Sequence, residues 1–345
     1  MTVKKKFSHL GFSIVFYLVA SNLISAIAIM IAAFIYAFVY YFDAMVAASN
    51  GGPAIDFSQT AALIASFRSN STLINLITAC SSYFVAVPLT ILVLNTPRFR
   101  DVPLNGMQFS TPVEKTMQRN LTPGELINFL LFMFPLGILG SLIGNILALI
   151  LGSITGQHLN DILTSALSNM SLPMVFLLSV VLAPIFEELV FRYAVIGYIR
   201  RYGEWNAIIV SALIFALIHE NIFQFFYAFA VGIIFGYVYV YTRKLIYSII
   251  LHCTFNFFGA FVPILIDPSF SPTNKASIIY SMIQYIVAII GFILLINYIR
   301  KGKLLETTPG APIQGKLSKD AILNPGMITL IVVCLIFTVL LMFFT

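Results

Sequence analysis

The sequence predicts an all-α polytopic membrane protein with about eight to nine transmembrane helices. Hydrophobic residues make up 60% of its 345 residues and charged residues only 9%, whereas soluble domains average about 25% charged residues. The apolar residues are also gathered into long runs, most of them near the roughly 20 residues that a helix needs to cross the hydrocarbon of a bilayer. Such a chain cannot assemble a water-soluble surface.

Nine apolar runs are candidates for membrane-crossing helices. The first follows three lysines and is about twice as long as the 7–15-residue apolar region of a signal peptide, so we expect it to stay in the mature protein. The expected spans are 11–42, 72–94, 126–151, 173–199, 205–219, 223–241, 245–266, 278–298 and 326–344.

Basic residues are divided unevenly between the connections. If the N-terminus is cytoplasmic, the cytoplasmic connections hold most of the Lys and Arg residues, and the opposite side keeps only Arg68 and Lys275. The positive-inside rule therefore predicts a cytoplasmic N-terminus and an outer C-terminus, and it explains the net charge of +6 without nucleic acid. The short loops favour a bacterial plasma membrane. The basic residues assigned to the cytoplasmic side are Arg98, Arg100, Lys115, Arg119, Arg200, Arg201, Arg243, Lys244, Arg300, Lys301, Lys303, Lys316 and Lys319.

The connections between the spans are too short to house a soluble domain, and no internal repeat is visible. One membrane domain, residues 1–345, is the expected organisation. The pairs Gly140-x-x-x-Gly144 and Gly232-x-x-x-Gly236 predict close approach of helices.

Three short patterns place ionisable side chains inside the apolar runs, where charged groups are costly and are functional candidates by default. Residues four apart share a helix face, so Glu188 can lie beside Arg192, whereas Glu187 is rotated by about 100° toward another neighbour. Pro184 removes a backbone donor near the acids and can bend the helix to admit water. The alternative is that Glu188 and Arg192 form only a structural ion pair. The patterns are Glu187-Glu188-x-x-x-Arg192, Phe215-x-x-x-His219 and His252-x-x-x-Asn256.

Two chemistries fit these residues, and both end in hydrolysis of an acyl bond by activated water. In the first, Glu187 is the general base for a water polarised by one His, while the other His and Asn256 donate hydrogen bonds to an oxyanion. In the second, a divalent metal such as zinc is the cofactor, with Glu187, Glu188, His219 and His252 as possible ligands. The sequence has no Gly-x-Ser-x-Gly elbow, no His-Glu-x-x-His and no Walker-type or dinucleotide-binding loop. Nucleotide-driven chemistry is therefore not expected.

In their order and spacing, the three patterns resemble the motifs of the CPBP family, the CAAX proteases and bacteriocin-processing enzymes, also called Abi proteins. The resemblance covers residues 173–262 and implies an intramembrane endopeptidase of metallo- or glutamate-type, whose helices form a conical or bundle-like core around a water-accessible cavity. It implies that Glu187 and His219 activate water, that His252 and Asn256 form the oxyanion site, and that Glu188 and Arg192 support them. The implied partners are membrane lipids and a membrane-bound protein or peptide substrate, with neither nucleic acid nor nucleotide.

Depth in the membrane is a geometric test of a shared site. Counting about 1.5 Å per residue from the expected cytoplasmic ends puts Glu187 roughly 18 Å deep, His219 roughly 21 Å and His252 about 10 Å. We expect helix tilt, and a short turn at Glu220-Asn221 that stops below the outer face, to close this gap. The rival functions are a catalytically silent scaffold or bacteriocin-immunity protein and, less favoured, a transporter, for which repeat symmetry would be expected.

Overall fold

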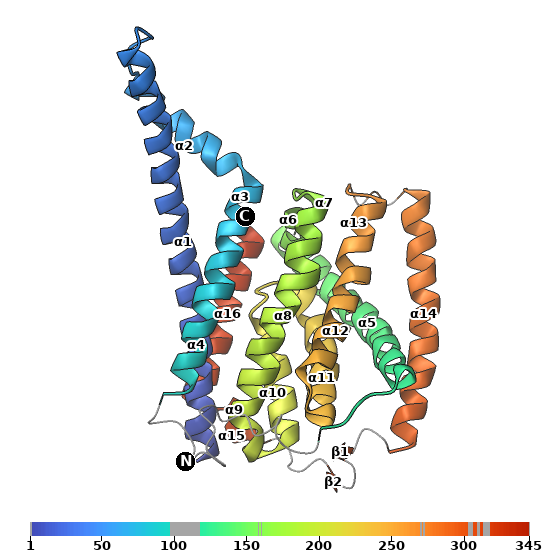
Figure 1. The fold of residues 1–345 in the computed structure, drawn as a ribbon. Helices are drawn as coiled ribbons and strands as arrows, with labels where there is room; N and C mark the ends of the chain where they lie inside the picture. Colours follow the sequence, from blue (N-terminus) through green and yellow to red (C-terminus); the bar gives the residue numbers. More distant parts are fainter. Residues whose placement is uncertain are drawn as a thin grey trace.

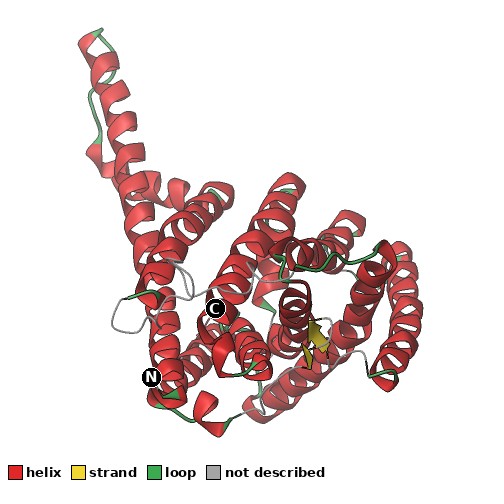
Figure 2. Ribbon diagram, turned by 60° about the horizontal axis from the view of Figure 1, so that its bottom comes forward, coloured by secondary structure: helices red, strands yellow, loops and turns green. Residues whose placement is uncertain are grey.

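The structure is a computed structural model that describes residues 2–96, 118–302 except 158, 160, 270 and 272, 306–308, 311–312 and 318–344. Within these residues the chain is helical almost throughout (Figures 1 and 2). A two-stranded antiparallel hairpin pairs β1 (Glu306–Thr308) with β2 (Ala311–Pro312). The predicted all-α membrane fold is confirmed.

Eight helices of the described residues are long and apolar enough to cross a membrane. Several of them are built from shorter segments that follow one another without a break, and three of these composite spans contain π-helical turns. The spans are α1 (Val3–Ser49), α3–η2–α4 (Ser71–Cys80, Ser81–Ala86, Val87–Leu94), α5 (Pro123–Thr155), α7–η6–α8–η7–α9 (Leu172–Val175, Phe176–Leu182, Ala183–Glu188, Leu189–Ile196, Gly197–Ile199), α11 (Ile222–Thr242), α12–η9–α13 (Leu245–Asn256, Phe257–Phe261, Val262–Ile266), α14 (Lys275–Arg300) and α16 (Pro325–Phe344).

Shorter segments connect or extend these spans. The long first helix rises well beyond the neighbouring helices, and α2 returns from its tip toward α3 (Figure 1). The shorter segments are η1 (Phe57–Gln59), α2 (Thr60–Ser69), α6 (Ile162–Ser168), η8 (Arg200–Tyr202), α10 (Glu204–Leu217) and α15 (Lys319–Ile322).

The fifth of the nine predicted spans, 205–219, is a short helix. α10 has 14 residues, which is about 21 Å at 1.5 Å per residue and less than the roughly 30 Å of the hydrocarbon. The chain turns after Leu217 and re-enters a helix at Ile222, with Glu220 in the left-handed region at φ +50°. The turn expected at Glu220-Asn221 is therefore present.

Close helix packing confirms the role predicted for the two glycine pairs. A Cβ on Gly140 would lie 2.4 Å from backbone atoms of Tyr227, so only glycine lets α5 approach α11 so closely here. A Cβ on Gly232 would lie 3.2 Å from Ala212 and Phe215, which brings α11 against α10. The hairpin of α10 and α11 is thereby held inside the bundle.

The N-terminus, the α9–α10 connection and the β1–β2 hairpin lie at one end of the bundle (Figure 1). That this end is cytoplasmic remains a prediction. The prediction depends on the distribution of basic residues, and part of that distribution lies outside the described residues. The basic residues concerned are Arg98, Arg100, Lys115, Lys303 and Lys316.

Candidate active site

The two glutamates lie in the middle of the long helix that runs from Leu172 to Ile199. Its backbone is π-helical over Phe176–Leu182 and again over Leu189–Ile196, and the α-helical turn Ala183–Glu188 between these segments ends with the acidic pair. π-Helical turns inside α-helices are rare and are frequent at functional sites.

Glu188 and Arg192 form a fully buried ion pair. Arg192 Nη1 lies 3.1 Å from Glu188 Oε1, and both side chains are 0% exposed. Arg192 Nη2 also donates to the carbonyl of Gly232 at 3.1 Å. The guanidinium carbon lies 4.6 Å from the ring centroid of Phe215 and 5.1 Å from that of Phe235. The ionic, hydrogen-bonding and cation–π contacts together offset the cost of burying the charge of Arg192 among apolar side chains.

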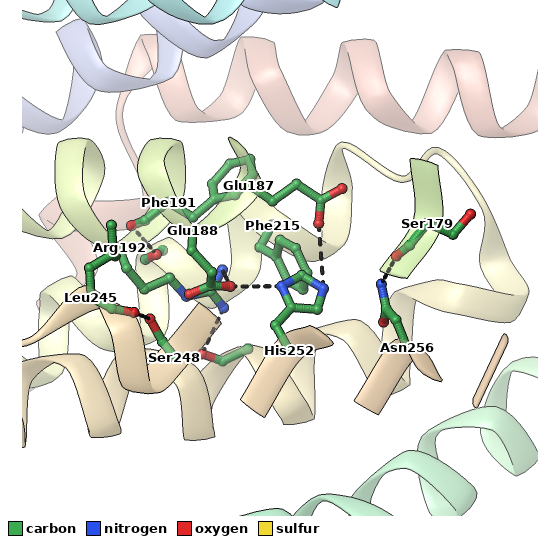
Figure 3. A network of polar contacts seen from close by, with 12 residues as sticks. Ser179, Glu187, Glu188, Phe191, Arg192, Phe215, Leu245, Ser248, His252 and Asn256 are labelled. Atoms are coloured by element: carbon green, nitrogen blue, oxygen red, sulfur yellow. Dashed lines mark hydrogen bonds and ion pairs between the residues drawn. The ribbon is translucent and has the colours of Figure 1, made fainter. Parts of the chain in front are cut away.

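His252 lies between the two carboxylates (Figure 3). Its Nδ1 is 2.9 Å from Glu188 Oε1, and its Nε2 is 3.6 Å from Glu187 Oε2. An ionised carboxylate can only accept, so Nδ1 carries the proton of the shorter contact and Nε2 is directed to Glu187. Glu188, braced by Arg192, thus fixes both the orientation and the tautomer of this imidazole.

His219 lies in the turn after α10 and is held by the last turn of that helix. Its Nδ1 lies 2.6 Å from the carbonyl oxygen of Phe215, one turn earlier. A carbonyl accepts and cannot donate, so Nδ1 carries the proton and Nε2 of the neutral ring is left as an acceptor. The Phe215 ring packs edge-on against both His219, at 4.8 Å between ring centroids, and His252, at 5.6 Å.

Asn256 is bound to the helix that carries the glutamates. Its Nδ2 donates to the carbonyl of Ser179 at 2.8 Å (Figure 3). Asn256 also lines the central cavity.

A single cavity of about 970 Å³ brings the motif side chains together. Glu187, His219, His252 and Asn256 all line it, whereas Glu188 and Arg192 lie behind its wall. The counted depths had set His252 apart from Glu187, yet their side chains are 3.6 Å apart between Oε2 and Nε2.

Two tyrosines that the motifs did not indicate also face this cavity. Tyr17 of α1 and Tyr83 of η2 line it and interact electrostatically with Glu187. The Tyr83 ring stacks on Phe186, the residue before the acidic pair, at 4.8 Å between centroids. An isolated Tyr in an apolar run has no local signal that distinguishes it from a packing residue.

A chain of hydrogen-bonded side chains beside the cavity was also missed, and three of its members, Asp161, Gln224 and Tyr227, line the cavity. Asn221 Nδ2 donates to Asp161 Oδ1 at 2.7 Å and to Gln224 Oε1 at 3.1 Å. Gln224 in turn donates to the Tyr227 hydroxyl at 2.9 Å. Asp161 is the N-cap of α6, and that capping position was the only available indication in the sequence.

A metal held by Glu187, Glu188, His219 and His252 stays a prediction. In the described part of the chain, no group of three or more His, Cys, Asp and Glu side chains is arranged to hold one. Glu188 is committed to Arg192 and to His252 Nδ1, whereas the Nδ1 contacts of His219 and His252 leave Nε2 of each ring for another partner.

The segment that builds this site is also the segment that matches known proteins. Residues 169–258 match the family described as type II CAAX prenyl endopeptidase Rce1-like. This range overlaps the predicted core, 173–262. A curated relative, the membrane-embedded CAAX protease MroQ of Staphylococcus aureus (strain USA300), is 34% identical over 115 residues, which are 31% of this chain and 46% of MroQ.

The chain therefore aligns with less than half the length of that relative. No solved structure matches. The three motifs, found in order and on one cavity wall, coincide with the matched segment. Over this segment the chain is similar to the type II CAAX prenyl endopeptidases and to the CAAX protease MroQ.

Proposed function

We propose that this integral membrane protein is an endopeptidase that uses activated water to hydrolyse a peptide bond of a membrane-associated protein or peptide. The observation that carries the proposal is the single cavity lined by Glu187, His219, His252 and Asn256, which come from three separate motifs. The family match supports the same class of reaction, because both the family description and the relative's name specify a CAAX protease.

Glu187 is the general base in this proposal. Its side chain is 22% exposed, while Glu188 beside it is 0% exposed and tied to Arg192. The freer acid takes a proton from a water in the cavity, and Nε2 of His219 accepts a hydrogen bond from the same water. The water oxygen then attacks the carbonyl carbon, and the proton passes through Glu187 to the leaving amine.

Asn256 and His252 stabilise the oxyanion that forms on the attacked carbonyl. Asn256 can donate with the amide hydrogen that Ser179 does not take. His252 can donate from Nε2 in its protonated form, because Nδ1 is already held by Glu188. Donors fixed in advance cost little reorganisation when the charge develops.

The surroundings of the site fit a substrate that arrives from the bilayer. Large apolar side chains are exposed along the membrane-crossing helices, which therefore contact lipid hydrocarbon. We further propose that the N-terminus is cytoplasmic and that the host membrane is a bacterial plasma membrane, as the distribution of basic residues indicates.

The test is a comparison of membrane proteomes from cells that express the wild type or Glu187→Gln. We expect new N-termini near membrane segments that only the wild type produces, with equal amounts of both proteins. Loss of a positioned general base typically slows a reaction by about 10²- to 10⁴-fold. Glu204→Gln is the matched control, since Glu204 pairs with Arg200 outside the cavity at 2.6 Å.

Identical N-termini in the wild type and Glu187→Gln would contradict the proposal. If the biological effect of the protein also survived Glu187→Gln, the silent scaffold or immunity function would be the better explanation. Loss of cleavage in Glu204→Gln as well would show that the assay reports folding rather than chemistry.

A further inference from the structure

We propose that Pro184 is a positioning residue: because it has no N–H, it leaves the carbonyl of Ser179 free to hold the amide of Asn256 at the cavity. The proposal rests on the proposed function for its catalytic consequence. Its structural part, that Pro184 and Asn256 are coupled through one carbonyl oxygen, can be tested without any substrate.

The hydrogen-bond register of the helix leads to this assignment. In the π-helical segment Phe176–Leu182 a backbone N–H donates to the carbonyl five residues earlier, and Ala183 N–H donates to Leu178 O in this way. The next donor in the same register would be residue 184, and its acceptor would be Ser179 O. Residue 184 is proline and has no N–H, so Ser179 O does not receive the helical hydrogen bond that residue 184 would otherwise donate.

A carbonyl without a donor is costly in an apolar environment. Asn256, which is 77 residues away along the chain, provides the missing donor, with 2.8 Å between Nδ2 and Ser179 O. Asn256 is the last residue of α12, immediately before the π-helical segment Phe257–Phe261. The contact therefore joins two helices at the level of the cavity.

The same contact fixes the orientation of the amide. A side-chain amide has two N–H bonds on Nδ2, and Ser179 O occupies one of them. With the first hydrogen bond made, rotation about the Asn256 side chain is restricted, and the second N–H keeps one direction. An oxyanion donor needs that kind of fixed geometry, because small misplacements reduce rates strongly.

The first experiment is a double-mutant cycle on the thermal unfolding midpoint of the purified full-length protein in detergent. Asn256→Ala should lower the midpoint in the wild-type background, since it leaves Ser179 O unpaired. In the Pro184→Ala background the new N–H can pair with Ser179 O. Asn256→Ala should then lower the midpoint by less than half as much. Asn256→Leu, which keeps the size and loses the donor, should behave as Asn256→Ala does.

The second experiment measures the initial rate of the cleavages made by the wild type, normalised to the amount of protein. Pro184→Ala should slow them by about 10- to 100-fold, because the amide loses its fixed direction. In the Asn256→Ala background, Pro184→Ala should cause no further decrease in the cleavage rate. Pro184→Ala gains a backbone hydrogen bond but removes buried ring carbons, so the cycle compares only the effect of Asn256→Ala in the two backgrounds.

Pro135→Ala is the control for removing a proline from a helix. Pro135 lies inside α5 and is buried, and Asn256→Ala should lower the midpoint equally with and without this substitution. The proposal would be overturned if Asn256→Ala lowered the midpoint equally in the wild-type and Pro184→Ala backgrounds. It would also be overturned if the rate losses of Pro184→Ala and Asn256→Ala multiplied in the double variant. If the wild type makes no cleavage, the proposed function fails, and the midpoint cycle still decides whether Pro184 and Asn256 are coupled.

Discussion

Replacing Arg192 by Met should destabilise the protein more than the loss of any exposed ion pair. The substitution keeps an unbranched chain of similar reach but removes the charge that lies 3.1 Å from Glu188 Oε1, in a pair whose two side chains are 0% exposed. Breaking a buried pair by removing one partner costs about 3–5 kcal/mol, because the remaining charge stays buried. The carbonyl of Gly232 loses its donor in the same variant.

The double variant Glu188→Met with Arg192→Met separates charge from packing. It removes both charges, so no isolated carboxylate remains, and it should be less destabilised than Arg192→Met alone. Some loss should persist because His252 Nδ1 no longer has its acceptor at 2.9 Å. The assay is equilibrium unfolding in mixed micelles, followed by far-UV circular dichroism.

An exposed ion pair provides the comparison. Arg119 and Glu125 lie 2.6 Å apart, with side chains 29% and 25% exposed. Arg119→Met should therefore cost about 1 kcal/mol or less. A loss below about 1 kcal/mol for Arg192→Met, or a double variant less stable than Arg192→Met, would refute the reasoning that burial sets the magnitude.

Two further predictions concern helix packing and metal. Gly140→Ala should lower the free energy of unfolding by about 1–3 kcal/mol, because its Cβ would lie 2.4 Å from the backbone of Tyr227. Gly259→Ala, where a Cβ meets nothing within 4 Å, should be neutral or stabilising in the same assay. Dialysis against a strong chelator should leave the cleavage rate unchanged, and elemental analysis should find less than one metal ion per chain. Loss of activity that zinc restores would contradict the metal-free mechanism.

The membrane spans could be predicted because apolar length is a local property of the sequence. Eight of the nine expected runs correspond to helices long enough to cross a bilayer. The run 205–219 has the composition of a span, but α10 stops after 14 residues. Its end depends on the turn that places His219 beside the cavity, and that turn is stabilised by contacts from other helices.

The depths counted from the sequence did not by themselves show that Glu187 and His252 meet, for a similar reason. The count assumed a uniform rise along each helix and a common starting level at the membrane face. The helix that carries Glu187 contains two π-helical segments, and α12 begins at Leu245, directly after the turn at Arg243 and Lys244. Neither feature has a reliable signature in the sequence.

The sequence by itself determined the class of protein, the helices and the acid, His and Asn side chains of the three motifs. Only the tertiary structure decided which partner each side chain takes. His252 pairs with Glu188 across 64 residues, and Asn256 pairs with Ser179 across 77. Spacing within one helix specifies a face, whereas contacts between helices depend on how the whole bundle packs. For that reason the position of Asn256 on the carbonyl that Pro184 leaves free could be recognised only after folding.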